Sequence, residues 1–232
     1  MLFSGATGRG LKIAVIDSGV NLRHPHICAA THGVVIGPEG NNRSDDPVGH
    51  GTAVMAAIQE KAPDAEYFAV KLFDESLRAT SDRLIAAIRW AIEHRMDVVN
   101  LSLGTPNFDY RDQLQALVEH AASKGITLVS ARCAGQHPVL PGVLEGVFGV
   151  DVDWELPRGS YRAAAANGLS YFLASGYPRP LPGIPPARNL HGISFAVANM
   201  TGFVARACET LGSRSFVEIR EALMAEALTT AI

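Results

Sequence analysis

The feature that most constrains the fold is a repeated alternation of short apolar strands with amphipathic helices. Runs rich in apolar and β-branched residues, typical of strands buried on both faces, occur at 11–19, 65–73, 97–104, 125–131 and 146–152. Apolar residues at helical spacing lie between them, at 81–95 and 110–125. We therefore expect an α/β fold, a three-layer sandwich with a mostly parallel central sheet and helices on both faces.

Local signals place the ends of the two helices and one irregular region. Ser81 is the expected N-terminal cap of the first helix, and Gly125 stands where a glycine ends the second. The segment 156–189 is rich in proline, glycine and alanine, which predicts surface loops with one or two short strands. No repeat or linker divides residues 1–232, so we expect a single domain without a recognisable pro-segment.

Composition excludes several classes of partner. The chain has 20 Lys and Arg against 23 Asp and Glu and no basic block, which predicts no nucleic-acid binding. Its apolar runs are shorter than the ~20 residues that span a membrane. The cysteines Cys28, Cys133 and Cys208 lack metal-ligand spacing, which favours a reducing, cytoplasmic setting. For Cys28 and Cys208 we expect a packing role.

Three segments place an aspartate, a histidine or a serine beside glycine: "VIDSGVNLRHP", "VGHGTAVMAAI" and "GISFAVANMTG". Each is weak alone, since Asp17 is compatible with a turn, His50 with a helix start and Ser194 with a helix cap. Together they offer a hydroxyl nucleophile, a base to take its proton and a carboxylate to orient that base. A helix start at Ser194 would also offer free N–H groups to an oxyanion.

In this order, and over nearly the whole chain, the segments resemble the subtilisin-like serine proteases. "DSGVNLRHPHI", "GHGTAV", "VVNLSLG" and "GISFAVANMTG" are similar to the family's aspartate, histidine, substrate-binding and serine segments. The resemblance implies a catalytic triad of Asp17, His50 and Ser194. It also implies that Ser102, Leu103 and Gly104 pair with the substrate backbone, where glycine leaves room for an added strand.

The resemblance breaks around the oxyanion site. "LVSARCAG" has Cys133 where the family has its oxyanion asparagine, and Arg132 where it has glycine. Ile193 and Ala198 replace the usual threonine and proline. A thiol is a weak donor, and loss of such a donor costs roughly a hundredfold to a thousandfold in turnover. The pattern predicts an altered oxyanion hole formed by Cys133 and the backbone N–H of Ser194.

Arg132 allows two interpretations. With Ala131 it would line the pocket for the residue before the scissile bond and favour acidic or small side chains. Alternatively, it forms a surface salt bridge.

The remaining histidines carry no metal-site pattern. His24 resembles a structural histidine of the family, and we expect surface positions for His26, His32, His94, His120 and His191. The stretch "NNRSDD" at 41–46 fits either a cation loop or a solvated loop. We expect no metal and no cofactor.

Two hypotheses follow from these residues. The first is a selective intracellular serine endopeptidase that acts on a peptide or protein substrate and processes a peptide precursor. The second is a catalytically impaired domain that binds peptides or proteins along Ser102–Gly104. The intact triad favours the first, and the sequence does not predict an oligomeric state.

Overall fold

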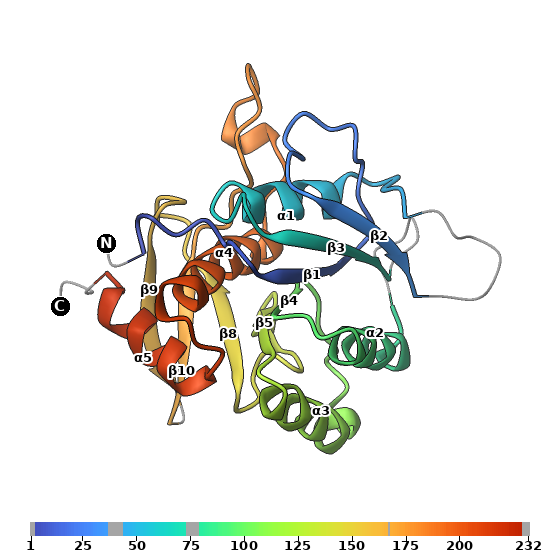
Figure 1. Cartoon of the computed structure of the whole chain (residues 1–232), viewed down its shortest axis with the longest axis vertical. Helices are drawn as coiled ribbons and strands as arrows, with labels where there is room; N and C mark the ends of the chain where they lie inside the picture. Colours follow the sequence, from blue (N-terminus) through green and yellow to red (C-terminus); the bar gives the residue numbers. More distant parts are fainter. Residues whose placement is uncertain (1–2, 37–43, 73–78, 167, 229–232) are drawn as a thin grey trace.

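The core of the fold is a sheet of eight strands between two layers of helices (Figure 1). It is seen in a computed structural model, which describes residues 3–36, 44–72, 79–166 and 168–228. The strands are β1 (Lys12–Asp17), β2 (Thr31–Val35), β3 (Glu66–Lys71), β4 (Val98–Leu101), β5 (Thr127–Ala131), β8 (Val147–Val152), β9 (Tyr161–Ala166) and β10 (Leu169–Ala174). Their order is β2-β3-β1-β4-β5-β8-β10-β9, and only β9 runs antiparallel to its neighbour. The predicted three-layer α/β fold is confirmed.

Helices cover both faces of the sheet. One layer contains α1 (His50–Gln59), α4 (Ile193–Leu211) and α5 (Phe216–Glu226), and the other contains α2 (Ser81–Glu93) and α3 (Arg111–Ser123). In β1, Ile13 and Val15 pack toward the first layer while Ala14 and Ile16 pack toward the second. Because both faces of the sheet are covered, the residues that point to either face are apolar. The strand is therefore a continuous apolar run.

The strand order locates the functional edge of the sheet. The chain adds β3 on one side of β1 and, after α2, adds β4 on the other side. Such a reversal opens a crevice beyond the carboxyl ends of the two central strands, where ligands bind in sheets of this type. Asp17 is the last residue of β1 and Ser102 follows β4, so both lie at this crevice.

The helix ends agree in part with the predictions. Gly125 follows α3 with a φ of +71°, a conformation that favours glycine, and its N–H bonds the carbonyl of Ala122. Ser81 is not the cap of α2, so that prediction was wrong. The cap is Thr80, whose hydroxyl accepts from the N–H of Arg83, while the Ser81 hydroxyl pairs with Thr105 at 2.9 Å.

The region 156–189 contains loops and two strands, as predicted. It includes the two six-residue strands β9 and β10, which form an antiparallel hairpin and extend the sheet from β8. Four alanines in β9 give little local strand signal, so pairing with β10 decides the conformation. Strand β2 and helix α5 were not predicted.

Smaller elements complete the chain, and the cysteines differ in burial. These elements are η1 (Phe108–Tyr110), η2 (Pro186–Arg188) and a short hairpin of β6 (Cys133–Ala134) with β7 (His137–Pro138). All three cysteines are free thiols. Cys208 is buried in the core as predicted, but Cys28 is exposed, so the packing role predicted for it was wrong. Within the described residues, no helix has the length and apolar character needed to cross a membrane.

A buried lysine links α1 to α4. Lys61 lies just after α1, and its Nζ donates to Oδ1 of Asn199 in α4 at 2.6 Å. The Asn199 amide in turn donates to the carbonyls of Ser175 and Tyr177. The lysine stem fills the space above Gly202, where an added Cβ would lie 2.7 Å from it. Burial and the charge of Arg158 lower the pKa of Lys61 to about 7.

We expect Lys61→Met to flatten the rise of stability with pH. The lowered pKa leaves the folded chain with fewer protons than the unfolded chain between about pH 7 and 10. The free energy of unfolding therefore rises with pH there, by up to about 1.4 kcal/mol per pH unit from this group. Urea unfolding from pH 6.5 to 9.5 measures the slope. The matched control is the exposed Lys124→Met, and equal slopes in wild type and Lys61→Met would contradict the expectation.

Candidate active site

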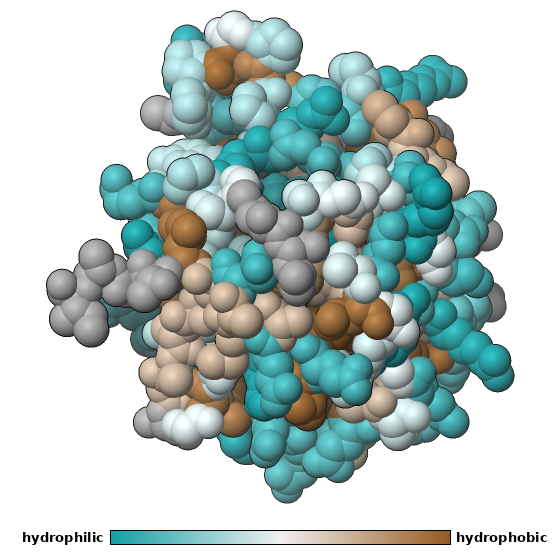
Figure 2. All heavy atoms as spheres, turned by 60° about the vertical axis from the view of Figure 1, so that its left-hand side comes forward, coloured by the Kyte–Doolittle hydropathy of each residue, from teal (hydrophilic) through white to brown (hydrophobic). Residues whose placement is uncertain are grey.

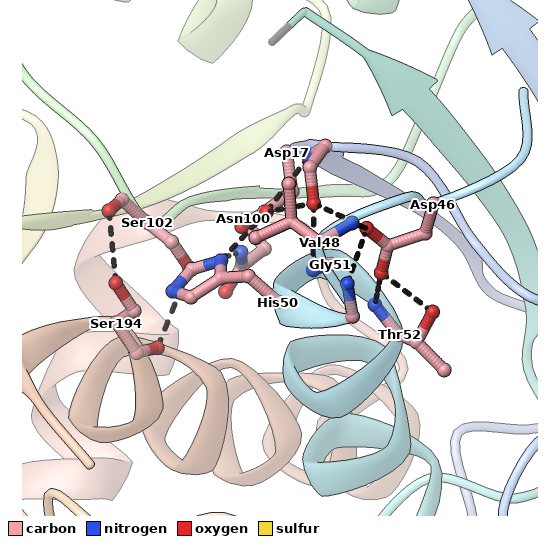
Figure 3. Close-up of polar contacts among 11 residues, drawn as sticks. Asp17, Asp46, Val48, His50, Gly51, Thr52, Asn100, Ser102 and Ser194 are labelled. Atoms are coloured by element: carbon pink, nitrogen blue, oxygen red, sulfur yellow. Dashed lines mark hydrogen bonds and ion pairs between the residues drawn. The ribbon is translucent and has the colours of Figure 1, made fainter. Parts of the chain in front are cut away.

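Asp17 and His50 meet at the carboxyl end of β1. Asp17 is almost fully buried, with 1% exposed, and its Oδ1 lies 2.7 Å from Nδ1 of His50, the first residue of α1 (Figure 3). The same oxygen accepts from the N–H of Ser18 at 2.8 Å. A carboxylate only accepts, so His50 carries its proton on Nδ1 and leaves Nε2 able to take another.

A second aspartate, Asp46, holds the first turn of α1. Its Oδ1 accepts from the N–H groups of Val48 and Gly49, and its Oδ2 accepts from the N–H and hydroxyl of Thr52. Ser18 bridges the two aspartates, because its hydroxyl lies 2.9 Å from Asp46 and 3.2 Å from Asp17. Sequence reasoning missed this role of Asp46. The signal was an aspartate three residues before the helix-start glycine, in a stretch interpreted as a cation loop or solvated loop.

The electrostatic surroundings favour the protonated form of His50. Burial of the ring alone would lower its pKa, but the hydrogen bond and charge of Asp17 and the charge of Asp46 outweigh burial and raise it. The ring also packs against Phe195 with 5.6 Å between the ring centroids. The imidazole is thus held as a base stronger than a free histidine.

Ser194 is the second residue of α4 and lies beside His50 (Figure 3). The N-cap position belongs to Gly192, whose φ of +152° and ψ of 178° lie in a region essentially restricted to glycine. Ser194 makes no capping bond. Its Oγ instead donates to the carbonyl of Ser102 at 3.3 Å, and the Ser102 hydroxyl donates to the Ser194 carbonyl at 3.3 Å. The structure therefore does not support the helix-cap interpretation.

The structure brings Asp17, His50 and Ser194 to one place but joins only the first two by a hydrogen bond. Both His50 and Ser194 belong to the part of the chain that the structure describes. The Ser194 hydroxyl donates to the Ser102 carbonyl instead of to His50. Bonds of this kind are often long or absent in unliganded sites and form when the substrate is bound.

A buried polar chain fixes Ser102. Asn100, fully buried in β4, donates to the Ser102 hydroxyl at 3.0 Å and accepts from the hydroxyl of Thr201 in α4 at 3.0 Å. Thr201 and Asn100 were not singled out from the sequence. The signal was a polar side chain inside an otherwise apolar strand, "VVNLSLG", which demands a buried partner.

Arg132 and Cys133 follow β5 on the other side of the crevice. The Arg132 guanidinium donates to Asp151 at 2.6 Å and stacks over the ring of Tyr171, 3.8 Å from its centroid. This matches the salt-bridge interpretation of Arg132. Burial and the charge of Asp151 raise the pKa of the Cys133 thiol, although Arg132 partly offsets them. The thiol is therefore neutral at neutral pH and only a weak donor.

The space between the two segments predicted to bind substrate is filled. Val139 donates to the Arg132 carbonyl at 2.8 Å, and Leu140 exchanges two 2.9 Å backbone hydrogen bonds with Thr105. A Cβ on Gly104 would lie 2.6 Å from the Val139 side chain. Val139 and Leu140 are at most 1% exposed. Little room remains between Ser102–Gly104 and Ala131–Arg132.

The described residues contain no group of three or more His, Cys, Asp or Glu side chains arranged to hold a metal ion. Part of the stretch 41–46 lies outside the described residues, namely 41–43. The carboxylate of Asp46, within that stretch, is engaged by the start of α1.

Comparison with known proteins identifies the class. A model of the "Subtilase family" matches residues 8–140. This is more than half of the chain, which therefore belongs to the subtilase family of serine peptidases. Subtilisin E of Bacillus subtilis (strain 168) is 36% identical over 136 residues, which cover 55% of this chain and 35% of that protein. The chain thus spans only about a third of the length of that relative.

Other relatives match more of the chain. The membrane-bound transcription factor site-1 protease of Mus musculus is 30% identical over 258 residues, covering 96% of this chain and 23% of that protein. Among solved structures, a lanthipeptide protease has a TM-score of 0.76 at 20% identity and covers 98% of this chain and 83% of its own. A cold-adapted subtilisin-like serine proteinase has a TM-score of 0.74 at 18% identity, covering 95% and 83%. These structures share the fold.

We expect Asp46→Asn to lower the pKa of His50. The substitution removes one of the charges that raise this pKa, so the neutral ring persists to lower pH. Titration of the His50 ring by NMR measures the change. Asp45→Asn is the matched control, because Asp45 is exposed and is not among the charges that raise this pKa. An unchanged or higher midpoint in Asp46→Asn would rule out the electrostatic role.

Proposed function

We propose that the chain is a serine endopeptidase in which Ser194 is the nucleophile, His50 the general base and Asp17 the residue that orients His50. The observation that carries this proposal is the 2.7 Å hydrogen bond from His50 to a carboxylate buried at the end of β1, beside a serine at the start of α4. A carboxylate in that position fixes the imidazole tautomer and stabilises the imidazolium that forms during attack.

The first step is release of the Ser194 hydroxyl from Ser102. A peptide strand laid along Ser102–Gly104 offers an N–H to the Ser102 carbonyl, which now accepts from Ser194. The freed hydroxyl turns to Nε2 of His50, which takes its proton as the oxygen attacks the substrate carbonyl. His50 then protonates the leaving amine, and water hydrolyses the acyl-enzyme by the same steps.

The oxyanion that forms has few donors. The backbone N–H of Ser194 lies in the first turn of α4, where such groups have no partner within the helix, and the helix dipole adds partial positive charge. The second predicted donor is the Cys133 thiol, a weaker one than an amide. Turnover is therefore slower than in a site that has an asparagine there.

Selective processing of a peptide fits the remaining features better than bulk degradation. The packing of Val139 against Gly104 favours small side chains before the scissile bond. A lanthipeptide protease is among the solved structures that share the fold, and precursor cleavage is the corresponding hypothesis for this chain. Three free cysteines favour a reducing, cytoplasmic setting.

The alternative is an impaired domain that binds peptides along Ser102–Gly104 without cleaving them. The replacement of an amide by the neutral Cys133 thiol favours it. The geometry of Asp17 and His50 favours catalysis instead, because a binding module has no need of an oriented base.

We expect a fluorophosphonate probe to label the wild-type protein once and Ser194→Ala not at all. The probe reacts only with a serine hydroxyl activated by a base, and intact mass measures the product. Ser123→Ala is the matched control, since Ser123 is exposed at the end of α3. Cys133→Asn supplies an amide donor and should raise the rate of peptide cleavage about tenfold to a hundredfold. An unlabelled wild type together with a labelled Cys133→Asn would favour the impaired domain.

We expect Val139→Gly to widen the preference before the scissile bond. The wild type should cleave peptides with Gly, Ala or Ser there, and the variant should gain about tenfold or more in kcat/KM for Leu or Phe relative to Ala. A peptide series that varies this position measures the ratio, and Val34→Ala in edge strand β2 is the control. A wild-type preference for Phe or Leu would contradict the role given to Val139.

A further inference from the structure

A cavity lies beside the candidate active site. It has a volume of about 510 Å³ and lies between the residues that follow β8 and the segment 177–189, which projects at the top of Figure 1. Its rim contacts the serine segment: the Trp154 ring is 6.0 Å from the ring of His191, and Gly192 donates to the carbonyl of Gly176 at 2.9 Å. His191 and Gly192 lead directly into Ser194, so the cavity adjoins the path of a bound peptide.

The walls of the cavity are apolar and aromatic. They include Trp154, Leu156, Tyr177, Pro178, Ile184 and Pro186. The rings of Trp154 and Tyr177 meet edge to face with centroids 5.5 Å apart. Trp154 and Ile184 nevertheless remain 44% and 43% exposed, and Figure 2 shows apolar atoms on the projecting segment. Pockets of this size with apolar walls suit a large side chain together with adjoining backbone.

Two polar groups in the cavity lining lack partners. Ser175 is 1% exposed, yet its Oγ has no hydrogen bond among the described residues, and neither has Nε of Arg158. The Ser175 carbonyl accepts a hydrogen bond from the Asn199 amide, which fixes the backbone of this residue, while the Ser175 hydroxyl has no partner among the described residues. A buried polar group without a partner destabilises the fold, and a ligand with a matching polar tip would supply the missing hydrogen bond.

Charge limits the chemistry of that tip. The terminal nitrogens of Arg158 already bind the carboxylate of Glu60, and Glu155 also lines the cavity. A carboxylate would therefore meet no uncompensated positive charge, whereas a neutral hydroxyl can bond both Ser175 and Arg158. The combination of a ring-sized apolar body and one hydroxyl is that of tyrosine.

We propose that this cavity binds a tyrosine side chain of the substrate peptide, with the ring against Trp154 and Tyr177 and the phenol bonded to Ser175 Oγ and Arg158 Nε. The proposal rests on the proposed function, because it assigns a subsite to the same substrate. It makes Trp154 and Ser175 specificity residues outside the segment Ser102–Gly104.

Binding is tested without catalysis in a protein that carries Ser194→Ala and Trp90→Phe. The chain has two tryptophans, so Trp154 is then the only one and its fluorescence reports the cavity. N-acetyl-tyrosinamide, N-acetyl-phenylalaninamide and N-acetyl-O-methyl-tyrosinamide are titrated separately. We expect saturable changes, with tyrosinamide bound about threefold to tenfold more tightly than phenylalaninamide. The O-methyl compound, which lacks the donor, should bind more weakly than tyrosinamide.

Ser175→Ala in the same background should remove the preference for tyrosinamide over phenylalaninamide. No saturable change, equal affinity for tyrosinamide and phenylalaninamide, or a preference that survives Ser175→Ala would overturn the proposal. The O-methyl comparison tests the same hydrogen bond if Ser175→Ala does not fold. Because this assay uses a protein without the nucleophile, failure of fluorophosphonate labelling would reject the proposed function and leave the cavity assignment standing.

Discussion

The hydrogen bond between Asp17 and His50 is the interaction on which the candidate site depends. It joins the end of the central strand β1 to the start of helix α1, so it forms only where these two elements are held in fixed positions relative to each other. Asp46 secures the helix start and Ser18 connects the two carboxylates. The imidazole is thus set by three residues that lie close together in the fold, and its basicity follows from the same contacts that fix its position.

Ser194 is held by contacts other than those of His50. Helix α4 carries Ser194 at its first turn, and two buried polar contacts anchor that helix, one from Thr201 to Asn100 of β4 and one from Asn199 to Lys61 after α1. Buried polar contacts add little net stability compared with apolar packing, but they fix one register between elements because any slip leaves a group unpaired. The helices that carry His50 and Ser194 are therefore aligned by buried polar contacts, and the one from Lys61 to Asn199 links them directly.

Local pattern explains how much could be predicted. The parallel sheet follows from apolar runs such as "LKIAVID", where both faces are covered, and it places Asp17 at the functional edge. The C-terminal end of α3 was predictable because Gly125 acts through its own backbone. The cap of α2 and the strand β9 were not, since Thr80 competes with Ser81 for one role and four alanines gain strand structure only by pairing with β10. The role of Asn100 depends on Thr201, which lies in a distant segment, so no local spacing encodes it. Asp46 contacts residues only two to six positions away, but the stretch 41–46 also fits a cation loop or a solvated loop.

The buried amine of Lys61 couples the packing of α1 against α4 to pH. The folded chain keeps this amine largely neutral above about pH 7, whereas the unfolded chain keeps it protonated up to about pH 10. The contribution of this group to the free energy of unfolding is therefore lost as the pH falls from about 10 to about 7 and does not change further in acid. The contact that links the helices of His50 and Ser194 is thus strongest in alkaline solution, where the imidazole of His50 is also neutral.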